Sequence, residues 1–259
     1  MERYALIGRK LGHSWSKEIH ERYFALTGKC AVYEMVELEP DELPSAFERF
    51  SAEGFRGVNV TIPYKTDTMP LMDELSDEVE RISALNTVSF ANGKKIGYNS
   101  DYHGLAESFD RFGVEIAGRD VVLLGTGGAS RAVDAICRDR GCKSLTYVSR
   151  TGGDGRLDYP AYEMRNDGEV LINCTPVGMF PNTGVSPVKR VTPFSAVVDL
   201  IYNPIRTELL RLAEEAGALT VNGLCMLVYQ AIYSQAVWNG VPFEREIAAK
   251  IYEEMRKQM

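Results

Sequence analysis

The chain has 259 residues, enough for one large or two ordinary domains, and its 45% hydrophobic and 25% charged residues are typical of a globular protein. A net charge of −7 and a pI near 5.2 disfavour a nucleic-acid-binding protein, which usually carries a basic face. No apolar run approaches the roughly 18 residues of a membrane span, and the first residues, MERYALIG, lack a basic-then-apolar signal pattern. We therefore expect a cytoplasmic protein that binds neither membranes nor nucleic acids.

The cysteines and histidines predict neither a disulfide nor a metal site. The cysteines are scattered, odd in number and without a CxxC pair, at positions 30, 137, 142, 174 and 225. This pattern favours reduced thiols in a cytosolic protein. His13, His20 and His103 do not make a metal-ligand spacing with them.

The first hundred residues alternate between strand and helix patterns. Strands are predicted at 4–8, 32–38, 57–62, 86–90 and 95–98, and helices at 16–28 and 40–54. Gly28 is a helix-ending glycine, and Asn92-Gly93 predicts a hairpin between the last two strands. Pro63 suits the first turn of a further helix, where the missing N–H costs nothing.

The rest of the chain reads as strand, helix, strand, with a junction at Asn99-Ser100-Asp101. Buried strands are predicted at 120–124, 145–149, 170–173 and 196–201, and helices at 102–112, 128–140, 208–216, 224–238 and about 243–255. Short apolar strands separated by helices indicate a parallel sheet covered on both faces. The helix at 224–238 is apolar nearly all round, so we expect it to be buried.

A glycine loop, Gly125-Thr126-Gly127-Gly128-Ala129-Ser130, follows the strand 120–124 and opens a helix. This is the context of a dinucleotide-binding loop. Gly125 permits a tight turn, Gly127 lets the backbone approach a pyrophosphate, and the helix N-terminus supplies N–H donors. Ser130 replaces the third glycine of the usual pattern, so the match is imperfect.

The end of the next strand indicates which dinucleotide binds. NAD-binding folds usually place an acid there for the ribose 2′-hydroxyl, but this chain has Ser149-Arg150-Thr151. A carboxylate would repel a 2′-phosphate, whereas Arg150 would bind it with charge-assisted hydrogen bonds. We favour NADP; the alternative is that Arg150 is an ordinary solvated loop arginine.

Polar side chains at the mouth of a buried strand suggest a second site. Asn59, Thr61 and Lys65 lie in Asn59-Val60-Thr61-Ile62-Pro63-Tyr64-Lys65, and Lys65 is the one residue of this run that can also move a proton. Ser14 and Ser16 can both donate to a carboxylate. Taken singly, the serines and Asp101 are explained as helix N-caps.

Taken together, these motifs resemble the shikimate dehydrogenase family over nearly the whole chain. The residues that carry the resemblance are GHSWS at 12–16, NVTIPYK at 59–65, Asn86-Thr87, NSD at 99–101, GTGGASRA at 125–132, NCTPVGM at 173–179, DLIYNP at 199–204 and NGLCMLVYQ at 222–230. The resemblance implies two α/β domains, with a substrate domain at 1–101 plus 224–259 and a Rossmann-type, NADP-binding domain with a parallel sheet at 102–223.

The resemblance also implies reversible NADPH-dependent reduction of 3-dehydroshikimate to shikimate. It makes Lys65 and Asp101 the catalytic pair, and an adjacent carboxylate would favour the ammonium form of the lysine. It implies that the substrate carboxylate is held by Ser14, Ser16 and Tyr202. It also implies that four residues bind the ring hydroxyls or support those contacts: Asn59, Thr61, Asn86 and Gln230. It assigns the cofactor to Asp77, Gly125, Thr126, Gly127, Gly128, Ala129, Ser149, Arg150, Thr151, Leu200 and Gly223.

The sequence departs from the usual family pattern at two positions, and it leaves two alternative functions open. Ser149 stands where relatives usually have asparagine, but Arg150 remains, so NADP preference should survive in a weakened form. Lys17 replaces a common proline after the serine pair. A quinate or dual quinate/shikimate dehydrogenase using NAD or either cofactor is the nearest alternative. A nucleotide-sensing protein on the same scaffold is the other, although a sensor has no need of Lys65 and Asp101. The sequence leaves both a monomer and a homodimer open.

Overall fold

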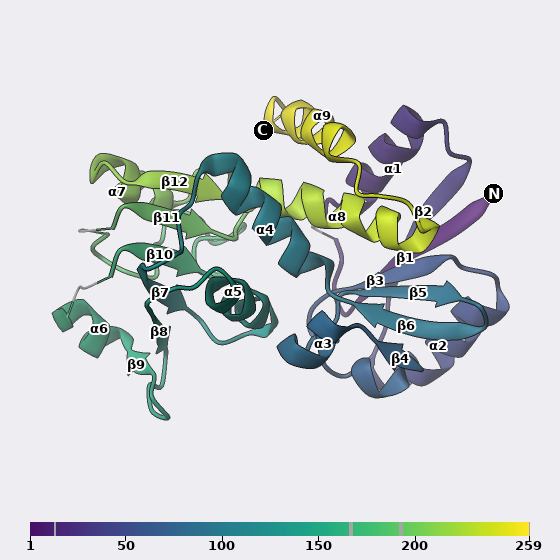
Figure 1. Cartoon of the computed structure of the whole chain (residues 1–259), viewed down its shortest axis with the longest axis horizontal. Coiled ribbons are helices and arrows are strands. Elements are labelled where there is room, and N and C mark those ends of the chain that lie inside the picture. Colours follow the sequence, from purple (N-terminus) through teal and green to yellow (C-terminus); the bar gives the residue numbers. More distant parts are fainter. Residues whose placement is uncertain (13, 166–167, 192–193, 259) are drawn as a thin grey trace. The chain divides into compact units, whose positions relative to one another are not determined.

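The computed structural model describes residues 1–12, 14–165, 168–191 and 194–258, which form two compact units (Figure 1). Unit 1 comprises residues 1–104 and 227–258, and unit 2 comprises residues 105–226. The junctions fall inside α4 (Ser100–Phe112) and α8 (Leu224–Asn239), three residues beyond the positions expected from the sequence. His13 of the 12–16 motif lies outside the described residues.

Unit 1 is built on a mixed sheet with the strand order β2-β1-β3-β5-β6-β4. Its strands are β1 (Glu2–Gly8), β2 (Ala31–Glu37), β3 (Gly57–Val60), β4 (Glu74–Leu75), β5 (Thr87–Ala91) and β6 (Lys94–Tyr98). Strand β1 pairs in parallel with β2 and β3, whereas β5 pairs antiparallel with β3 and β6. Asn92 and Gly93 join β5 to β6 with positive φ angles of 53° and 74°, as a two-residue hairpin requires.

Helices cover this sheet. They are α1 (Ser16–Thr27), α2 (Leu43–Ala52), α3 (Asp77–Ile82), α9 (Arg245–Arg256) and the unit 1 parts of α4 and α8, with 3₁₀ turns at Pro40–Glu42 and Met69–Leu71. Phe47 and Phe50 of α2 pack with Val58 and Val88 of the sheet. On β1, Tyr4 stacks on Phe24 of α1 and on Trp238 of α8. Burial of these aromatic rings supplies much of the hydrophobic stabilisation of the unit.

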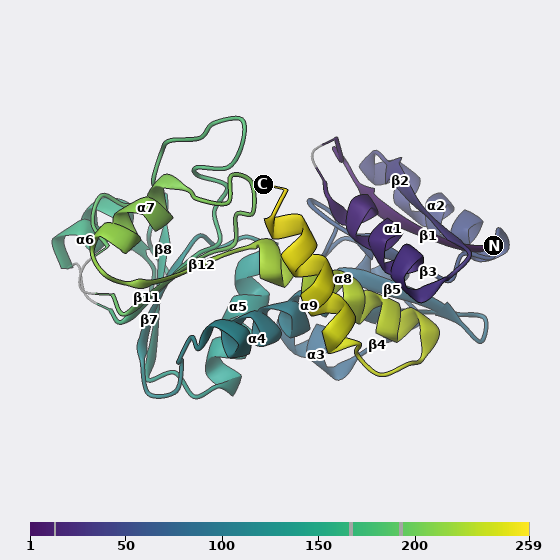
Figure 2. The same cartoon turned by 90° about the horizontal axis from the view of Figure 1, so that it is seen from above.

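Unit 2 is a parallel sheet with the strand order β12-β11-β10-β7-β8-β9. Its elements are β7 (Asp120–Leu124), α5 (Gly128–Asp139), β8 (Ser144–Ser149), β9 (Leu157–Asp158), α6 (Tyr159–Arg165), β10 (Val170–Asn173), β11 (Ala196–Asp199), α7 (Glu208–Glu215) and β12 (Leu219–Asn222). Read from β7, this is the 3-2-1-4-5-6 order of a dinucleotide-binding fold, whose ligands bind where the strand order reverses. Figure 2 shows α5 on the opposite side of the sheet from α6 and α7.

The predicted mixture of α/β units with a parallel sheet in the second is confirmed, but two local predictions are wrong. Pro63 does not open a helix; residues 62–68 form turns, in which Tyr64 N–H donates to the Thr61 carbonyl at 3.0 Å. Helix α4 begins at Ser100, so Asp101 lies in its first turn. Its cap is Asn99, whose Oδ1 accepts from Tyr102 N–H at 3.1 Å.

Helix α8 is buried, as its uniform apolar character predicts. Leu224, Cys225, Val228, Ala231 and Ile232 are all inaccessible to solvent. The helix has 16 residues. Across the described residues, no helix combines the length and apolarity needed to cross a membrane.

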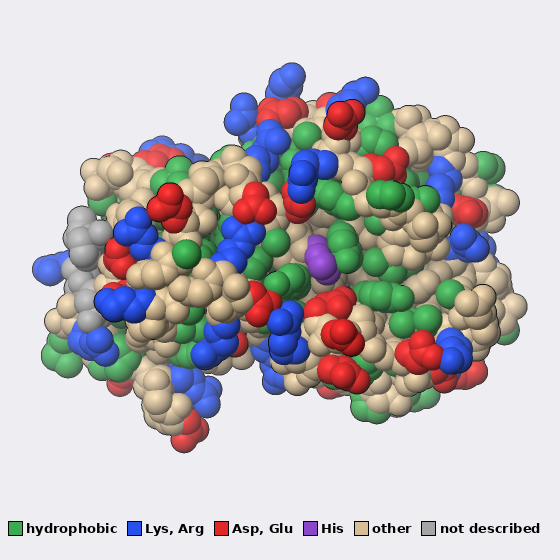
Figure 3. All heavy atoms as spheres, viewed as in Figure 1, with side chains coloured by type: hydrophobic (Ala, Val, Ile, Leu, Met, Phe, Trp, Pro, Cys, Tyr) green, Lys and Arg blue, Asp and Glu red, His purple; other side chains and the backbone are tan. Residues whose placement is uncertain are grey.

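Charges of both signs are mixed over the face drawn in Figure 3. Several ion pairs among the described residues join helical side chains four positions apart, such as Arg22–Glu18 and Arg138–Asp134. Exposed pairs of this kind contribute little to stability. The fold is therefore held mainly by its two hydrophobic cores.

Candidate active site

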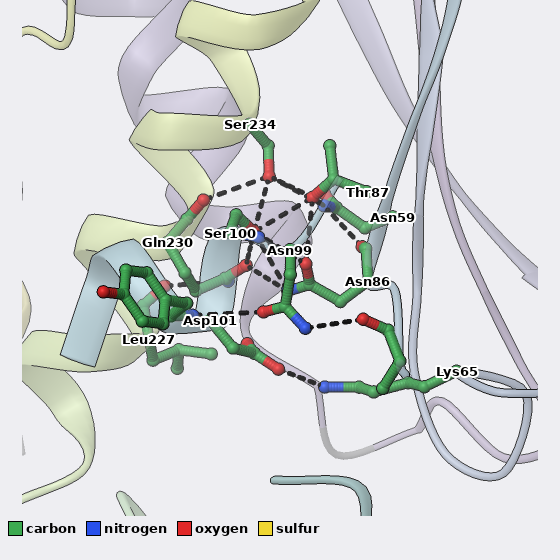
Figure 4. A network of polar contacts seen from close by, with 12 residues as sticks. Asn59, Lys65, Asn86, Thr87, Asn99, Ser100, Asp101, Leu227, Gln230 and Ser234 are labelled. Carbon is green, nitrogen blue, oxygen red and sulfur yellow. Dashed lines mark hydrogen bonds and ion pairs between the residues drawn. The ribbon is translucent and has the colours of Figure 1, made fainter. Parts of the chain in front are cut away.

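Lys65 and Asp101 are brought together by the fold of unit 1. Lys65 lies in the turns after β3, and Asp101 in the first turn of α4. Lys65 Nζ donates to Asp101 Oδ2 (Figure 4), and the two side chains are only 15% and 11% exposed. A largely buried ammonium–carboxylate pair can hold and transfer a proton at a defined position.

A buried polar network lies behind this pair (Figure 4). It consists of the side chains of Asn59, Asn86, Thr87, Ser100, Gln230 and Ser234. These side chains come from β3, β5, α4 and α8, and from the position just before β5. Buried polar groups are stable only when they find hydrogen-bonding partners, so such a network fixes one arrangement of the elements that carry it.

The amide of Asn59 is fully engaged inside this network. Its Oδ1 accepts from Tyr33 Oη at 2.8 Å, and its Nδ2 donates to Ser234 Oγ at 2.8 Å and to Thr87 Oγ1 at 3.1 Å. Asn59 is 5% exposed. The buried position of Asn59 therefore suits it to holding neighbouring side chains in place.

Asn86 and Gln230 are also turned inward. Asn86 Oδ1 accepts from Ser100 N–H at 2.7 Å, and Asn86 Nδ2 donates to Ser100 Oγ at 2.9 Å. Gln230 Oε1 accepts from Ser100 Oγ at 3.1 Å, and Gln230 Nε2 donates to the Leu227 carbonyl at 2.9 Å. Ser100 thus joins both amides at the start of the helix that carries Asp101.

Three residues of the network, Ser100, Thr87 and Ser234, have no role predicted from the sequence. Ser100 and Thr87 lie inside the quoted motifs. Ser234 had a weaker signal, because it is a polar residue four positions after Gln230 on a largely apolar helix. Its hydroxyl donates to the Gln230 carbonyl at 3.0 Å, which explains how it is accommodated in the helix.

Ser14, Ser16 and Thr61 present hydroxyls near chain turns. The hydroxyl oxygens of Ser14 and Ser16 lie 3.1 Å apart, and Ser16 begins α1. Ser14 Oγ accepts from Ser16 N–H at 3.3 Å. Thr61 is half-buried, and its hydroxyl has no hydrogen-bonding partner among the described residues. Within the described part of unit 1, no hydrogen bond links the two serines to the Lys65–Asp101 pair.

The glycine loop of unit 2 has the geometry that a dinucleotide requires. Gly125 adopts a φ of +97°, and a Cβ there would lie 2.9 Å from Thr175 Cγ2. Gly127 is the N-cap of α5, and a Cβ there would meet nothing within 4 Å. The space beside Gly127 at the N-terminus of α5 is therefore open, which suits the close approach of a phosphate. Thr126, Gly128 and Ala129 complete the loop and the first turn of the helix.

The end of β8 lies beside this loop, since Gly125 N–H donates to the Val148 carbonyl at 2.8 Å. Arg150 and Thr151 are exposed, so the guanidinium is available to an anion. Ser149 is 8% exposed, and its buried hydroxyl has no partner among the described residues. An accessible loop, a helix N-terminus and an exposed arginine together fit a phosphorylated dinucleotide.

Buried Asp199 organises the strand ends on the other side of the glycine loop. Its carboxylate accepts from Thr207 Oγ1 at 2.6 Å, Asn173 Nδ2 at 2.9 Å and Ile201 N–H at 3.1 Å. Burial raises the pKa of Asp199 to about 6, although these three donors act to lower it. This acid has no role predicted from the sequence.

Asn173 extends this arrangement to the glycine loop. Its Oδ1 accepts from both the N–H and the hydroxyl of Thr175, at 3.0 and 2.7 Å. Thr175 is the residue whose methyl group limits the space at Gly125. The ends of β10 and β11 are thereby fixed next to the loop that would hold a pyrophosphate.

The remaining predicted residues are divided between the units. Leu200, Tyr202 and Gly223 belong to unit 2, where a Cβ on Gly223 would lie 2.0 Å from the Leu200 carbonyl oxygen, so only glycine fits. Tyr202 is half-buried, and burial raises its pKa. Asp77 is exposed at the start of α3 in unit 1.

The two units define an α/β protein with a dinucleotide-binding fold and a largely buried lysine–aspartate pair. A family model described as the shikimate dehydrogenase substrate binding domain matches residues 6–88. The chain is 37% identical to shikimate dehydrogenase (NADP(+)) of Clostridium perfringens (strain 13 / Type A), over 99% of both chains. The chain therefore belongs to the shikimate dehydrogenase family.

Solved structures agree with this assignment. A chorismate mutase/shikimate 5-dehydrogenase fusion protein from Clostridium acetobutylicum superimposes with a TM-score of 0.96 at 38% identity, covering 100% of this chain and 98% of that one. Shikimate 5-dehydrogenase from Thermus thermophilus, in complex with NADP(H) and shikimate, gives a TM-score of 0.88 at 29% identity, covering 98% and 99%.

Proposed function

We propose that this protein catalyses the reversible NADPH-dependent reduction of 3-dehydroshikimate to shikimate in aromatic amino-acid biosynthesis, in the cytoplasm. The ion pair between Lys65 and Asp101 is the observation that carries the proposal. A protein that only sensed a nucleotide would have no use for a largely buried proton donor. The family relationship, over 99% of a relative named for shikimate and NADP(+), supports the choice of substrate and cofactor.

Lys65 acts on the oxygen of the reacting carbonyl. NADPH, when bound, supplies the hydride that reduces the C3 carbonyl carbon. The Lys65 ammonium donates a proton to the oxygen as negative charge develops on it, which produces the alcohol. In the oxidation direction the neutral lysine takes that proton back. Asp101 holds the lysine side chain in place and favours its ammonium form.

The substrate-binding roles follow from the chemistry and exposure of the side chains. The adjacent hydroxyls of Ser14 and Ser16, with that of Tyr202, hold the substrate carboxylate. Thr61, whose hydroxyl is not used within the described residues, contacts a ring hydroxyl. Buried Asn59, Asn86 and Gln230 support those contacts through the network.

The cofactor-binding roles belong mainly to unit 2. The glycine loop, Gly125 to Ala129, holds the pyrophosphate, and Ser149, Arg150 and Thr151 hold the adenosine 2′-phosphate end. Leu200 and Gly223 are assigned to the cofactor, and Asp77 is assigned to its nicotinamide end. Unit 2, residues 105–226, is accordingly the NADP-binding domain, and unit 1, residues 1–104 with 227–258, is the substrate-binding domain.

One spectrophotometric experiment tests the proposal. Shikimate or quinate is offered with NADP⁺ or NAD⁺, and absorbance of the reduced cofactor is followed. We expect the highest kcat/KM for shikimate with NADP⁺. Faster turnover of quinate with NAD⁺ would replace the proposal by a quinate dehydrogenase, and no turnover with any combination would favour a nucleotide sensor.

Replacing Arg150 with alanine should raise the KM for NADPH at least tenfold and change the KM for NADH little. The reason is that charge-assisted hydrogen bonds contribute about 1.5–3 kcal/mol, and NADH has no 2′-phosphate to make them. Steady-state kinetics with both cofactors measures the effect. Arg190→Ala, at another exposed arginine of unit 2, is the matched control. An equal rise in both KM values at Arg150 would show that the guanidinium does not bind the 2′-phosphate.

A further inference from the structure

Lys65 and Asp101 are 36 positions apart in the chain, and their pairing depends on how two backbone segments are joined. The segment Ala84–Leu85 lies between Lys65 and Asp101 in the sequence. Leu85 N–H donates to the Lys65 carbonyl at 2.8 Å, so this segment is hydrogen-bonded directly to the backbone of the lysine. The neighbouring Ala84 carbonyl accepts from Asn99 Nδ2, also at 2.8 Å.

The oxygen of the Asn99 side-chain amide is hydrogen-bonded to the helix that carries Asp101. Asn99 Oδ1 accepts from Tyr102 N–H at 3.1 Å, in the first turn of α4 that carries Asp101. Asn99 is 1% exposed. One buried amide therefore joins the helix turn of the aspartate to the segment that is bonded to the lysine backbone.

We propose that Asn99 is a positioning residue that sets the Asp101 carboxylate against the Lys65 ammonium. This inference rests on the proposed function, because it concerns the proton transfer of that reaction. Asn99 contacts neither reacting group through its side chain. It acts by fixing the separation and orientation of the two segments that carry them, and small displacements of catalytic groups lower rates strongly.

The need for both ends of the amide separates this role from ordinary helix capping. Serine, aspartate and asparagine are about equally good N-caps, because each offers an oxygen to the first-turn N–H groups. Only asparagine, among these, also carries an N–H donor that reaches the Ala84 carbonyl. Serine is too short, and aspartate would place a carboxylate oxygen against a carbonyl oxygen.

The experiment compares Asn99→Ser, Asn99→Asp and Asn99→Ala in the full-length protein. We expect all three to lower kcat for shikimate oxidation about 10- to 100-fold, with the KM for shikimate and NADP⁺ changed less than threefold. The solvent deuterium isotope effect on kcat should rise, because a misaligned lysine makes proton transfer slower relative to hydride transfer. A role limited to capping predicts instead that Asn99→Ser keeps wild-type kcat.

Asn239→Ser is the matched control. Asn239 also lies in unit 1, and its amide donates to the Gln235 carbonyl at 2.6 Å and accepts from Tyr4 Oη at 3.1 Å, away from the pair. It should leave kcat and the isotope effect unchanged. If Asn99→Ser does not fold, as judged by circular dichroism, Asn99→Asp carries the test. Loss of kcat in that variant without a rise in the isotope effect would overturn the proposal.

The outcome is distinguishable from failure of the proposed function. If wild-type protein does not oxidise shikimate with NADP⁺, the proposed function is wrong and Asn99 has no proton transfer to position. If the wild type is active and Asn99→Ser retains kcat within threefold, the proposed function stands and the positioning role is wrong.

Discussion

Replacing Lys65 with methionine is expected to lower kcat by roughly 10²–10⁴, about 3–5 kcal/mol of transition-state stabilisation, with a smaller change in KM. Methionine keeps much of the length and apolar surface of the lysine stem but has no ammonium. The proton for the developing alkoxide must then come from water. Because Lys65 is only 15% exposed, water is a poor substitute at that position.

Steady-state kinetics in both reaction directions measures this effect. Lys95→Met is the matched control, because Lys95 is also a lysine of unit 1 with a side chain mostly covered, 19% exposed, and paired with Glu48. It should leave kcat unchanged. A kcat for Lys65→Met within threefold of the wild-type value would remove Lys65 from the chemistry.

Lowering the pH from 7.5 to 5 should destabilise unit 1 by about 2 kcal/mol through His20 alone. His20 is fully buried in α1, stacked on Tyr33 with ring centroids 4.0 Å apart. Burial lowers its pKa from 6.5 to about 3, because the charged imidazolium would lose its hydration. Its neutral ring instead lies 2.9 Å, at Nδ1, from Gln235 Nε2.

The sign follows from the two pKa values. Above pH 6.5 the histidine is neutral in both folded and unfolded chains, so its full stabilisation is present. Between pH 6.5 and about 3, His20 is protonated in the unfolded chain but not in the folded chain. The free energy of unfolding therefore decreases progressively as the pH falls. Each pH unit in this range costs about 1.4 kcal/mol.

Urea unfolding of wild type, His20→Phe and His20→Gln at several pH values measures this slope. Both tryptophans, Trp15 and Trp238, belong to unit 1, so their fluorescence reports that unit. Neither variant can titrate at position 20, so both should show a flatter loss of stability below pH 6.5, whatever their stability at pH 7.5. Equal slopes in all three proteins would contradict the prediction. If neither variant folds, the His20 imidazole resonances of wild type should show no protonation down to pH 5.

The sequence by itself determined the elements whose signals are local. The apolar runs at 120–124 and 170–173 are strands with the predicted bounds, because buried parallel strands need continuous apolar residues. Asn92-Gly93 forms the predicted turn, since few other residues adopt two positive φ angles in succession. The strand-loop-helix context was likewise enough to locate the glycine loop.

The tertiary structure decided what local signals could not specify. Strands β4 and β9 are two residues each and have no periodicity to detect; they exist because β6 and β8 offer them partners. Pro63 was compatible with a helix start, but the chain turns there to hydrogen-bond back to Thr61.

The candidate site shows the same division. The sequence motifs were enough to identify four polar residues as candidates for the site: Lys65, Asp101, Asn59 and Asn86. Whether each side chain points toward solvent or into the interior depends on partners distant in the chain, such as Ser234, which lies 175 positions from Asn59. The sequence therefore supplied the chemical groups, whereas long-range packing selected the partners of each, because a buried amide must satisfy its hydrogen bonds with whatever the fold brings near it.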